Sequence, residues 1–162
     1  MRRRNGYTLI ELVLVLLLLT FVAVAVFLLT DVGSAAYARI YANRDQAADL
    51  RIGLSYIDVR LKKIDGVGKV ELLPAPFGGG QALVLTQEIE GLEYETRLYV
   101  ADGMMRELFS RKGLPVNADM AAEIARADKL EARFIGEQQL VLTLSSNGES
   151  PVSASQWSYL RV

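Results

Sequence analysis

Residues 7–30 read YTLIELVLVLLLLTFVAVAVFLLT, and this stretch sets the expected fold of the whole chain. Between Leu12 and Leu29 only Thr20 interrupts a run of apolar side chains. As a helix, that run would extend about 27 Å, which is close to the hydrocarbon thickness of a bilayer. A buried core helix so long and so apolar on every side would need a protein much larger than 162 residues around it. The stretch therefore predicts a membrane-spanning helix.

The flanking charges predict an orientation for this helix. Arg2, Arg3 and Arg4 precede the apolar run, so the positive-inside rule places that end in the cytoplasm and the rest of the chain outside. The whole chain has 18 basic and 19 acidic residues. Without these three arginines, residues 7–162 have 15 basic against 19 acidic residues and are mildly acidic. Binding of nucleic acid through counterion release is therefore not favoured, and no nucleic-acid contact is expected.

The chain has no histidine and no cysteine. This excludes disulfides, thiolate catalysis, Cys/His zinc sites and His-dependent triads. The three glycines at residues 78–80 lack the Lys-Ser/Thr of a phosphate-binding loop. Alternation in the sequence predicts that Glu88, Glu90, Glu93 and Glu95 lie on the solvent face of a hairpin instead of forming a calcium site. We expect no enzyme activity, no catalytic residue, no metal ligand and no cofactor.

An ordinary signal sequence is the alternative reading of the amino terminus. The apolar run is longer than a typical signal-peptide core, but Ser34-Ala35-Ala36 would serve as a cleavage site for signal peptidase. In that case the chain is a secreted binding domain, or, without cleavage, an extracellular binding domain held by a signal anchor. Neither role requires a carboxylate within the apolar segment.

Glu11 is that carboxylate, and it lies near the start of the apolar segment. An acid in a membrane span costs up to about 2–3 kcal/mol and marks a functional site with a partner to be named. A simple anchor gains nothing from it. The natural partner of an isolated carboxylate in lipid is a fixed positive charge, and a newly exposed α-amino group supplies one.

The segment Gly6-Tyr7-Thr8-Leu9-Ile10-Glu11-Leu12-Val13, behind a short basic leader, resembles the class III signal of type IV pilins and type II secretion pseudopilins. The resemblance implies that a prepilin peptidase cuts after Gly6 and methylates the new amino terminus at Tyr7. It also implies that Glu11 pairs with the terminal amine of a neighbouring subunit during filament assembly. The family usually has phenylalanine after the cut, so Tyr7 is a mild departure.

The same resemblance implies the partners and the location of the protein. The partners would be the prepilin peptidase, other pilin or pseudopilin subunits, an inner-membrane assembly platform and the lipid bilayer. The protein would cross the cytoplasmic membrane once, with a short cytoplasmic amino terminus and an extracytoplasmic head, before entering an envelope or surface filament. The absence of a cysteine-closed loop and of a calcium loop favours a minor subunit over a major one.

A second helical pattern follows the apolar run. Apolar residues spaced alternately by four and three predict one buried helical stripe, formed by Leu50, Leu54, Ile57, Leu61 and Ile64. Most charged residues of this region lie off the stripe, and Asp65-Gly66 ends the helix. Residues 7–64 are thus expected to form one nearly continuous helix.

Strand signals replace the helical period after residue 66. We expect a short strand at residues 70–73, a three-stranded meander over residues 82–110, a hairpin over residues 130–144 and a last edge strand at residues 156–162. Asn117 or Asp119 is expected to cap a short helix through residues 120–125. Trp157 is expected to pack against the head.

The predicted fold is therefore α+β and pilin-like: one long amino-terminal helix packed on an antiparallel β-meander. Its first half would span the membrane and its second half would be amphipathic. We expect a leader at residues 1–6, a transmembrane half-helix at 7–30, an amphipathic half-helix at 31–65 and a β-sheet head at 66–162. Residues 37–148 also resemble an uncharacterised pilin-like family, known only as a domain of unknown function, which implies no activity.

Overall fold

The computed structural model describes residues 9–64, 69–148 and 151–160. The chain divides into two compact units, Met1–Ala42 and Asn43–Val162, and each is described by itself. Helix α1 (Leu9–Lys62) contributes residues to both units. In the first unit, described from residue 9, α1 is regular helix, and nearly all of its apolar side chains up to Leu29 are exposed.

In the second unit, α1 buries one stripe of side chains. Leu50 and Ile57 are completely buried, and Leu54 and Leu61 are each 4% exposed. The predicted stripe is confirmed at these positions, which recur at helical spacing and so share one face. The helix ends at Lys62, because the amides of Lys63 and Ile64 bond back to carbonyls three residues earlier, at 3.2 and 3.1 Å, and tighten the last turn.

Five antiparallel strands form the first sheet, in the order in which they follow along the chain. They are β1 (Val70–Pro74), β2 (Gln81–Ile89), β3 (Leu92–Ala101), β4 (Met104–Arg111) and β5 (Ala122–Arg126). The turns Glu90-Gly91 and Asp102-Gly103 have positive φ at both residues, which matches the twist of two-residue hairpins. The predicted strand at residues 70–73 and the three-stranded meander are confirmed.

The expected short helix through residues 120–125 is wrong. Only a 3₁₀ turn, η1 (Ala118–Met120), forms there, and the next residues are strand β5. The side chain of Asn117 does not cap this turn; its amide donates to Asp119 at 3.3 Å instead. Pairing with β4 satisfies the backbone of β5 and buries Ala125, so the ladder outweighs the local helix pattern.

Three antiparallel strands form the second sheet, in the order β6-β7-β8. They are β6 (Lys129–Ile135), β7 (Gln139–Ser146) and β8 (Val152–Tyr159). The predicted hairpin is confirmed, and the last edge strand begins four residues earlier than expected. The head therefore contains two meanders instead of one, because the chain leaves the first sheet after β5.

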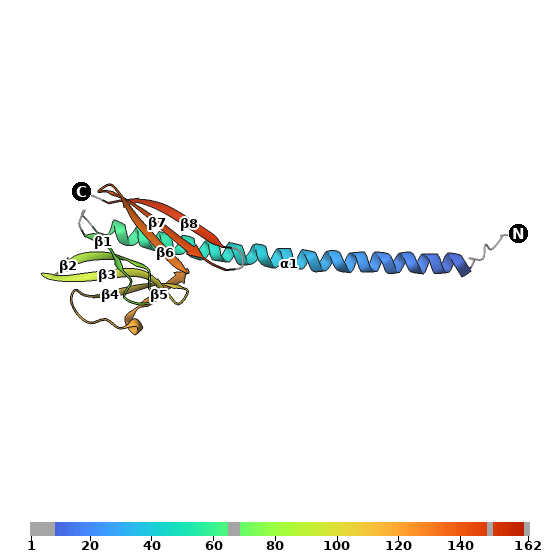
Figure 1. Ribbon diagram of the computed structural model, residues 1–162, viewed down its shortest axis with the longest axis horizontal. Coiled ribbons are helices and arrows are strands. Elements are labelled where there is room, and N and C mark those ends of the chain that lie inside the picture. Colours follow the sequence, from blue (N-terminus) through green and yellow to red (C-terminus); the bar gives the residue numbers. More distant parts are fainter. Residues whose placement is uncertain (1–8, 65–68, 149–150, 161–162) are drawn as a thin grey trace. The chain divides into compact units, whose positions relative to one another are not determined.

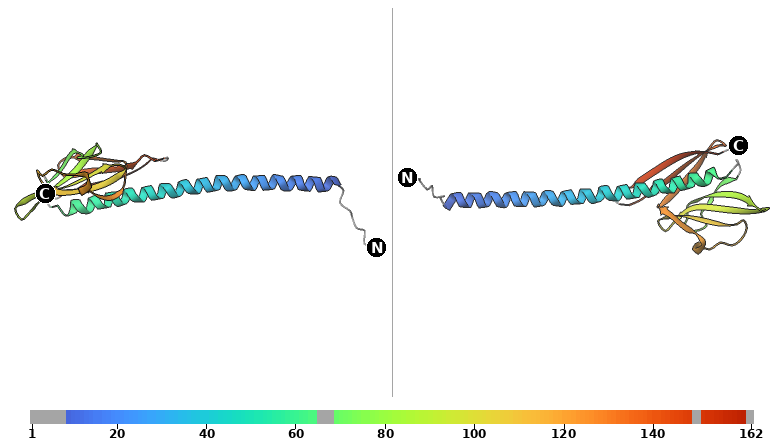
Figure 2. Two further views of the ribbon diagram at one scale, coloured as in Figure 1. Left: turned by 90° about the horizontal axis from the view of Figure 1, so that it is seen from below. Right: turned by 180° about the vertical axis from the view of Figure 1, so that it is seen from behind.

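Within residues 43–162 both sheets lie beside α1 (Figures 1 and 2), and one hydrophobic core joins the helix to both of them. Inward residues of β2, β3, β6 and β7 pack on the helical stripe, among them Leu85, Leu98 and Leu142. A second cluster, which includes Val84 and Tyr99, lies on the opposite face of the first sheet. Parts of β2 and β3 are thus buried on both faces, and the α+β fold of a helix packed on antiparallel sheets is confirmed.

The acidic hairpin follows the prediction at three of its four glutamates. Glu88, Glu90 and Glu93 are exposed, but Glu95 is only 6% exposed. Arg97 lies two residues further along the same face of β3, and its Nε and Nη2 donate to Oε2 of Glu95 at 3.1 and 2.6 Å. The guanidinium group covers this carboxylate, so alternation alone did not predict its burial.

Candidate functional site

The amino-terminal part of α1 has the length and composition of a membrane span. Leu9–Thr30 is helical throughout, with a mean hydropathy of 3.3 over its most apolar window, and none of that window is buried within the protein. At the rise of an α-helix, 22 residues extend about 33 Å, which is enough to cross the hydrocarbon core of a bilayer. The apolar surface that a water-soluble protein would bury is exposed along this segment.

The two hydroxyl groups of this segment are satisfied within the helix. Thr20 Oγ1 donates to the carbonyl of Leu16 and Thr30 Oγ1 donates to that of Val26, both at 2.8 Å. An unpaired hydroxyl in an apolar medium costs free energy, and a bond to the preceding turn removes most of that cost. The threonines are therefore compatible with a lipid environment.

Glu11 is the exception in the segment. It is exposed and lies in the first turn of α1, where the helix dipole favours a negative charge. Among the residues that the structure describes, no basic side chain forms an ion pair with Glu11. Gly6 and Tyr7, the predicted cleavage and methylation residues, lie outside the described residues.

This arrangement can bind a cation at one end of an apolar helix. A carboxylate at the edge of a lipid-length segment is costly when left alone, and a positively charged group from another chain relieves that cost. The segment contains no histidine or cysteine, and the described residues contain no cluster of three or more acidic side chains able to hold a metal ion.

A second polar cluster fixes α1 to the first sheet. Arg60 Nε donates to Glu107 Oε2 at 2.9 Å, and Arg60 Nη2 donates to Glu107 Oε1 at 2.5 Å. The hydroxyl of Tyr56 donates to the same carboxylate and accepts from Arg60 Nη2 at 2.9 Å. The guanidinium carbon also lies 5.2 Å from the centre of the Tyr56 ring. We call these three residues the helix clamp.

The helix clamp changes the acid–base behaviour of Tyr56. Burial raises the pKa of the Tyr56 phenol, and its hydrogen bond to the Glu107 carboxylate raises it further, although Arg60 opposes both effects. The phenol therefore stays protonated and keeps donating to Glu107. The bidentate ion pair of Arg60 with Glu107 joins the helix to β4, and the hydrogen bond between Arg60 and Tyr56 lies within the helix. Together they restrict rotation of this part of α1 about its axis.

Sequence reasoning missed the helix clamp. Arg60 was expected only to lie largely off the buried stripe; its side chain is 34% exposed and that of its partner Glu107 is 10% exposed. Two signals were available. Tyr56 and Arg60 are one helical turn apart, and Glu107 has the same inward parity in β4 as the buried Met105. An acid at an inward strand position needs a partner, which a helix on that face can supply.

Two family comparisons agree with this geometry. Residues 1–27 match the prokaryotic N-terminal methylation motif, and residues 48–147 match the family described as a domain of unknown function (DUF4860). No curated protein and no solved structure matches the chain. The second match covers more than half of the 162 residues and contains both sheets except β8. The chain therefore belongs to the DUF4860 family and, with a prepilin-type methylation motif at its amino terminus, is a type IV pilin-like protein.

Proposed function

We propose that this protein is a structural subunit, and a minor one, of a type IV pilus or a type II secretion-like pseudopilus. The observation that carries the proposal is the Glu11 carboxylate in the first turn of a membrane-length apolar helix, within the matched methylation motif. Pilin-like features point to a structural role instead of an enzymatic one. The minor role rests on a head without the cysteine-closed loop common among major pilins.

Processing would begin at the junction of Gly6 and Tyr7. A prepilin peptidase cuts there, which removes residues 1–6 with their three arginines and keeps the apolar helix intact. Glycine before the cut leaves room for the peptidase to approach the backbone. The same enzyme then methylates the amino group of Tyr7. The product is a helix that carries an amine on its first residue, Tyr7, and an acid on its fifth, Glu11.

Assembly would pair these two charges between subunits. Glu11 of one subunit binds the methylated amine of Tyr7 in its neighbour, so that neither charge remains alone in lipid. This pairing sets the axial register between adjacent helices as the filament grows. The partners are other pilin or pseudopilin subunits and an inner-membrane assembly platform that extracts each subunit from the bilayer.

The orientation follows from the charges at the amino terminus. Arg2, Arg3 and Arg4 hold residues 1–6 in the cytoplasm, residues 7–30 cross the membrane, and the remaining chain lies outside. The second part of the helix, up to residue 65, carries the β-sheet head formed by residues 66–162. The cleavage site is then on the cytoplasmic face, where a peptidase embedded in the membrane reaches it.

Two substitutions in the native host separate processing from assembly. Gly6→Ala should leave the full-length precursor in the membrane, because a side chain now occupies the approach to the scissile bond. Glu11→Ala should be processed normally but be depleted from sheared filaments by about tenfold or more, as expected for loss of a charge pair worth about 1.4 kcal/mol or more. Leu12→Ala, next to Glu11 in the same apolar segment, is the matched control and should assemble.

Normal processing of Gly6→Ala would contradict the peptidase assignment. Filaments with normal amounts of the Glu11→Ala variant would contradict the amine-pairing mechanism for this subunit. Rescue of assembly by Glu11→Asp but not by Glu11→Gln would show that charge, and not hydrogen bonding alone, is required.

A further inference from the structure

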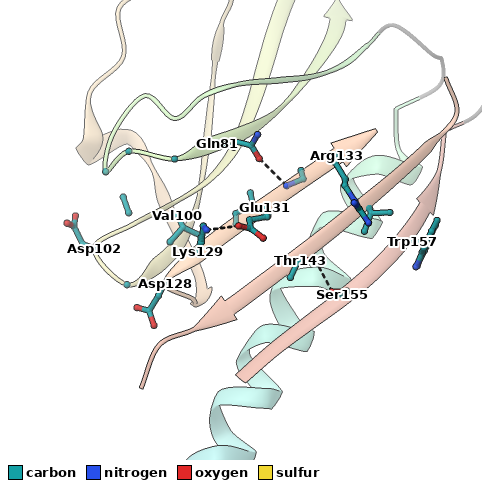
Figure 3. Close-up of a pocket in the computed structure, with 18 residues that line it drawn as sticks. Gln81, Val100, Asp102, Asp128, Lys129, Glu131, Arg133, Thr143, Ser155 and Trp157 are labelled. Atoms are coloured by element: carbon teal, nitrogen blue, oxygen red, sulfur yellow. Dashed lines mark hydrogen bonds and ion pairs between the residues drawn. The ribbon is translucent and has the colours of Figure 1, made fainter. Parts of the chain in front are cut away.

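The head contains a groove that the proposed filament role does not use. It is open to solvent, has a volume of about 920 Å³ and lies between the end of the first sheet and the outward face of the second (Figure 3). Its walls are the glycine turn at residues 78–80, the Asp102-Gly103 turn and the outward side chains of β6, β7 and β8. All of these elements belong to the unit Asn43–Val162. The volume is typical of a site for a small organic ligand.

Trp157 is the largest side chain in the groove, and it is 56% exposed. The expectation that it packs against the head is wrong, because Ala154 and Ser158 take the inward positions of β8 and the pleat turns Trp157 outward. In the sheet, Val141 lies beside Trp157 and Arg133 beside Val141. An exposed indole on a rigid strand offers a flat apolar face that loses little conformational entropy on binding.

The groove next to Trp157 carries groups that recognise hydroxyls. Glu131, Thr143 and Ser155 form the adjacent row across the three strands, and Thr143 Oγ1 lies 2.8 Å from Ser155 Oγ (Figure 3). Lys129 Nζ bonds to Oε1 of Glu131 at 2.5 Å, which leaves Oε2 available. Gln81 uses its Oε1 to accept the amide of Ala132 at 3.2 Å, and its NH₂ group has no hydrogen-bond partner among the residues that the structure describes.

The charges of the groove argue for a neutral ligand. Asp102, Asp128 and Glu131 supply three carboxylates, against the two cations Lys129 and Arg133. Phosphate-rich ligands such as nucleic acids need a basic groove, which this is not. Planar carboxylate, amide and guanidinium groups present paired acceptors or donors, and such pairs match two neighbouring hydroxyls of one sugar ring.

The glycine turn keeps the opposite wall free of side chains. A Cβ on Gly78 would lie 2.5 Å from Ala101 Cβ and 2.8 Å from Ala101 Cα, so the turn lies directly on the end of β3 only because residue 78 is glycine. Gly79 and Gly80 have positive φ, and a Cβ there would meet nothing within 4 Å. Their backbone groups therefore border open space, where a ligand can approach closely.

We propose that this groove binds a neutral oligosaccharide of β-linked hexopyranose units. The apolar C–H face of one sugar ring stacks on Trp157, while its equatorial hydroxyls bond to Glu131, Arg133 and the Thr143–Ser155 pair. Gln81 and the glycine turn contact the next sugar unit. This site lies in the head and involves none of Gly6, Tyr7 and Glu11. Sugar binding can therefore be tested separately from filament assembly.

Trp157 also provides the test, because it is the one tryptophan of the chain. The full-length protein is prepared in lauryldimethylamine oxide, since detergents with sugar headgroups would compete for the groove. Cellotetraose and chitotetraose are the probes, each titrated while tryptophan emission is recorded. Stacking of a sugar removes water from the indole, so we expect a saturable shift of the emission to shorter wavelength with at least one probe.

Variants measured by titration calorimetry locate the binding. Trp157→Ala should weaken binding of that probe by about tenfold or more, while Trp157→Phe, which keeps an aromatic face, should retain part of the affinity. Glu131→Gln should weaken it less than Trp157→Ala. Tyr159→Ala is the matched control, because Tyr159 lies two residues away on the same face of β8, is 70% exposed and does not line the groove.

Three results would overturn the proposal. The first is the absence of any saturable response to both oligosaccharides at millimolar concentration in a protein whose thermal unfolding is normal. The second is equal loss of affinity in Trp157→Ala and Tyr159→Ala. The third is a saturable emission shift with oligothymidylate or with a lysine-rich peptide in place of the sugars, which would assign the groove to a different class of ligand.

Discussion

The two ends of α1 are equally regular helix, but they distribute apolar side chains in opposite ways. Over Leu9–Thr30 apolar residues occupy every side and almost all are exposed. Between residues 50 and 61 only one stripe is apolar and buried, and Asp58 and Arg60 lie off it. Backbone hydrogen bonding is satisfied in both parts by the helix itself.

Apolar side chains with similar exposed fractions therefore belong to different kinds of surface in the two parts of the helix. Ile52 and Val59 are 54% and 49% exposed in the head part of α1, which is comparable to Val13 or Leu12 near the start of the helix. In the head part they lie on one side of the helix in a small mixed surface with Arg51, Ser55 and Tyr56. In the first part they form an uninterrupted surface that only lipid or neighbouring apolar helices can cover.

Deletion of residues 12–29 is expected to have the largest effect on this comparison. Membrane insertion of that run is favourable by roughly 6 kcal/mol, so its removal should move the protein from the membrane pellet to the supernatant after carbonate extraction. The control is the double variant Ile52→Ser, Val59→Ser, which removes exposed apolar residues from the head part and should stay in the pellet. Release of both proteins, or of neither, would contradict the division of the helix.

Substitution of Ile57 by alanine tests the buried stripe. Ile57 is completely buried, so Ile57→Ala should lower the free energy of unfolding of the head by about 3 kcal/mol. Ile52→Ala is matched in residue type and lies on the same helix, but its side chain is 54% exposed and its cost should be under about 0.5 kcal/mol. Urea denaturation followed by near-ultraviolet circular dichroism measures both. Equal losses of unfolding free energy in the two variants would contradict the assignment of Ile57 to the buried stripe.

Removal of the Glu107 carboxylate tests the helix clamp. Glu107→Ala leaves Arg60 without its partner, and because that guanidinium is about one-third exposed the expected cost is about 2 kcal/mol, below that of a fully buried pair. Lys62→Ala breaks the exposed pair with Asp58 on the same helix and should cost about 0.5 kcal/mol or less. If Glu107→Ala lowers the free energy of unfolding no more than Lys62→Ala does, the helix clamp does not stabilise the head.

The pH dependence of stability is the smallest effect expected. The pKa of Tyr56 is raised in the folded protein, chiefly by burial, so the folded state holds this proton more tightly than the unfolded state. The resulting stabilisation is complete below the pKa of an unfolded tyrosine, about 10, and is lost as pH rises through the folded pKa. Tyr56→Phe should therefore lose less stability than the native protein as the pH rises above about 10. Burial also raises the pKa of Tyr99, but Tyr99 is present in both proteins and cancels.

Local patterns in the sequence predicted most of the fold. The helical stripe from Leu50 to Leu61 and the hairpin turns at Asp102-Gly103 and Gly136 depend on neighbours within a few residues, and the structure contains them. Strand β5 was predicted as helix because its local pattern is weak and its conformation is set by pairing with β4. The burial of Glu95 was missed because it depends on how Arg97 folds over it.

The candidate sites differ in the same way. The processing and assembly residues Gly6, Tyr7 and Glu11 fall within one short motif, so they could be predicted without knowledge of the fold. The helix clamp joins residues 47 or more positions apart, and the groove joins the glycine turn at 78–80 to Trp157. The sequence offered signals for single members of the clamp, but which helix face meets which strand, and which turn meets Trp157, depends on how the two sheets pack with α1.

The most direct test of the central claim is the mass and amino-terminal sequence of the protein recovered from its native membranes. Cleavage after Gly6 with retention of the apolar helix predicts a chain that begins at N-methylated Tyr7 and remains in the membrane fraction. A chain that begins near Tyr37, after Ser34-Ala35-Ala36, would contradict the account, because signal peptidase would then have removed Glu11 and the whole apolar segment. An uncut chain that begins at Met1 would contradict it as well, and would leave the segment as a static anchor.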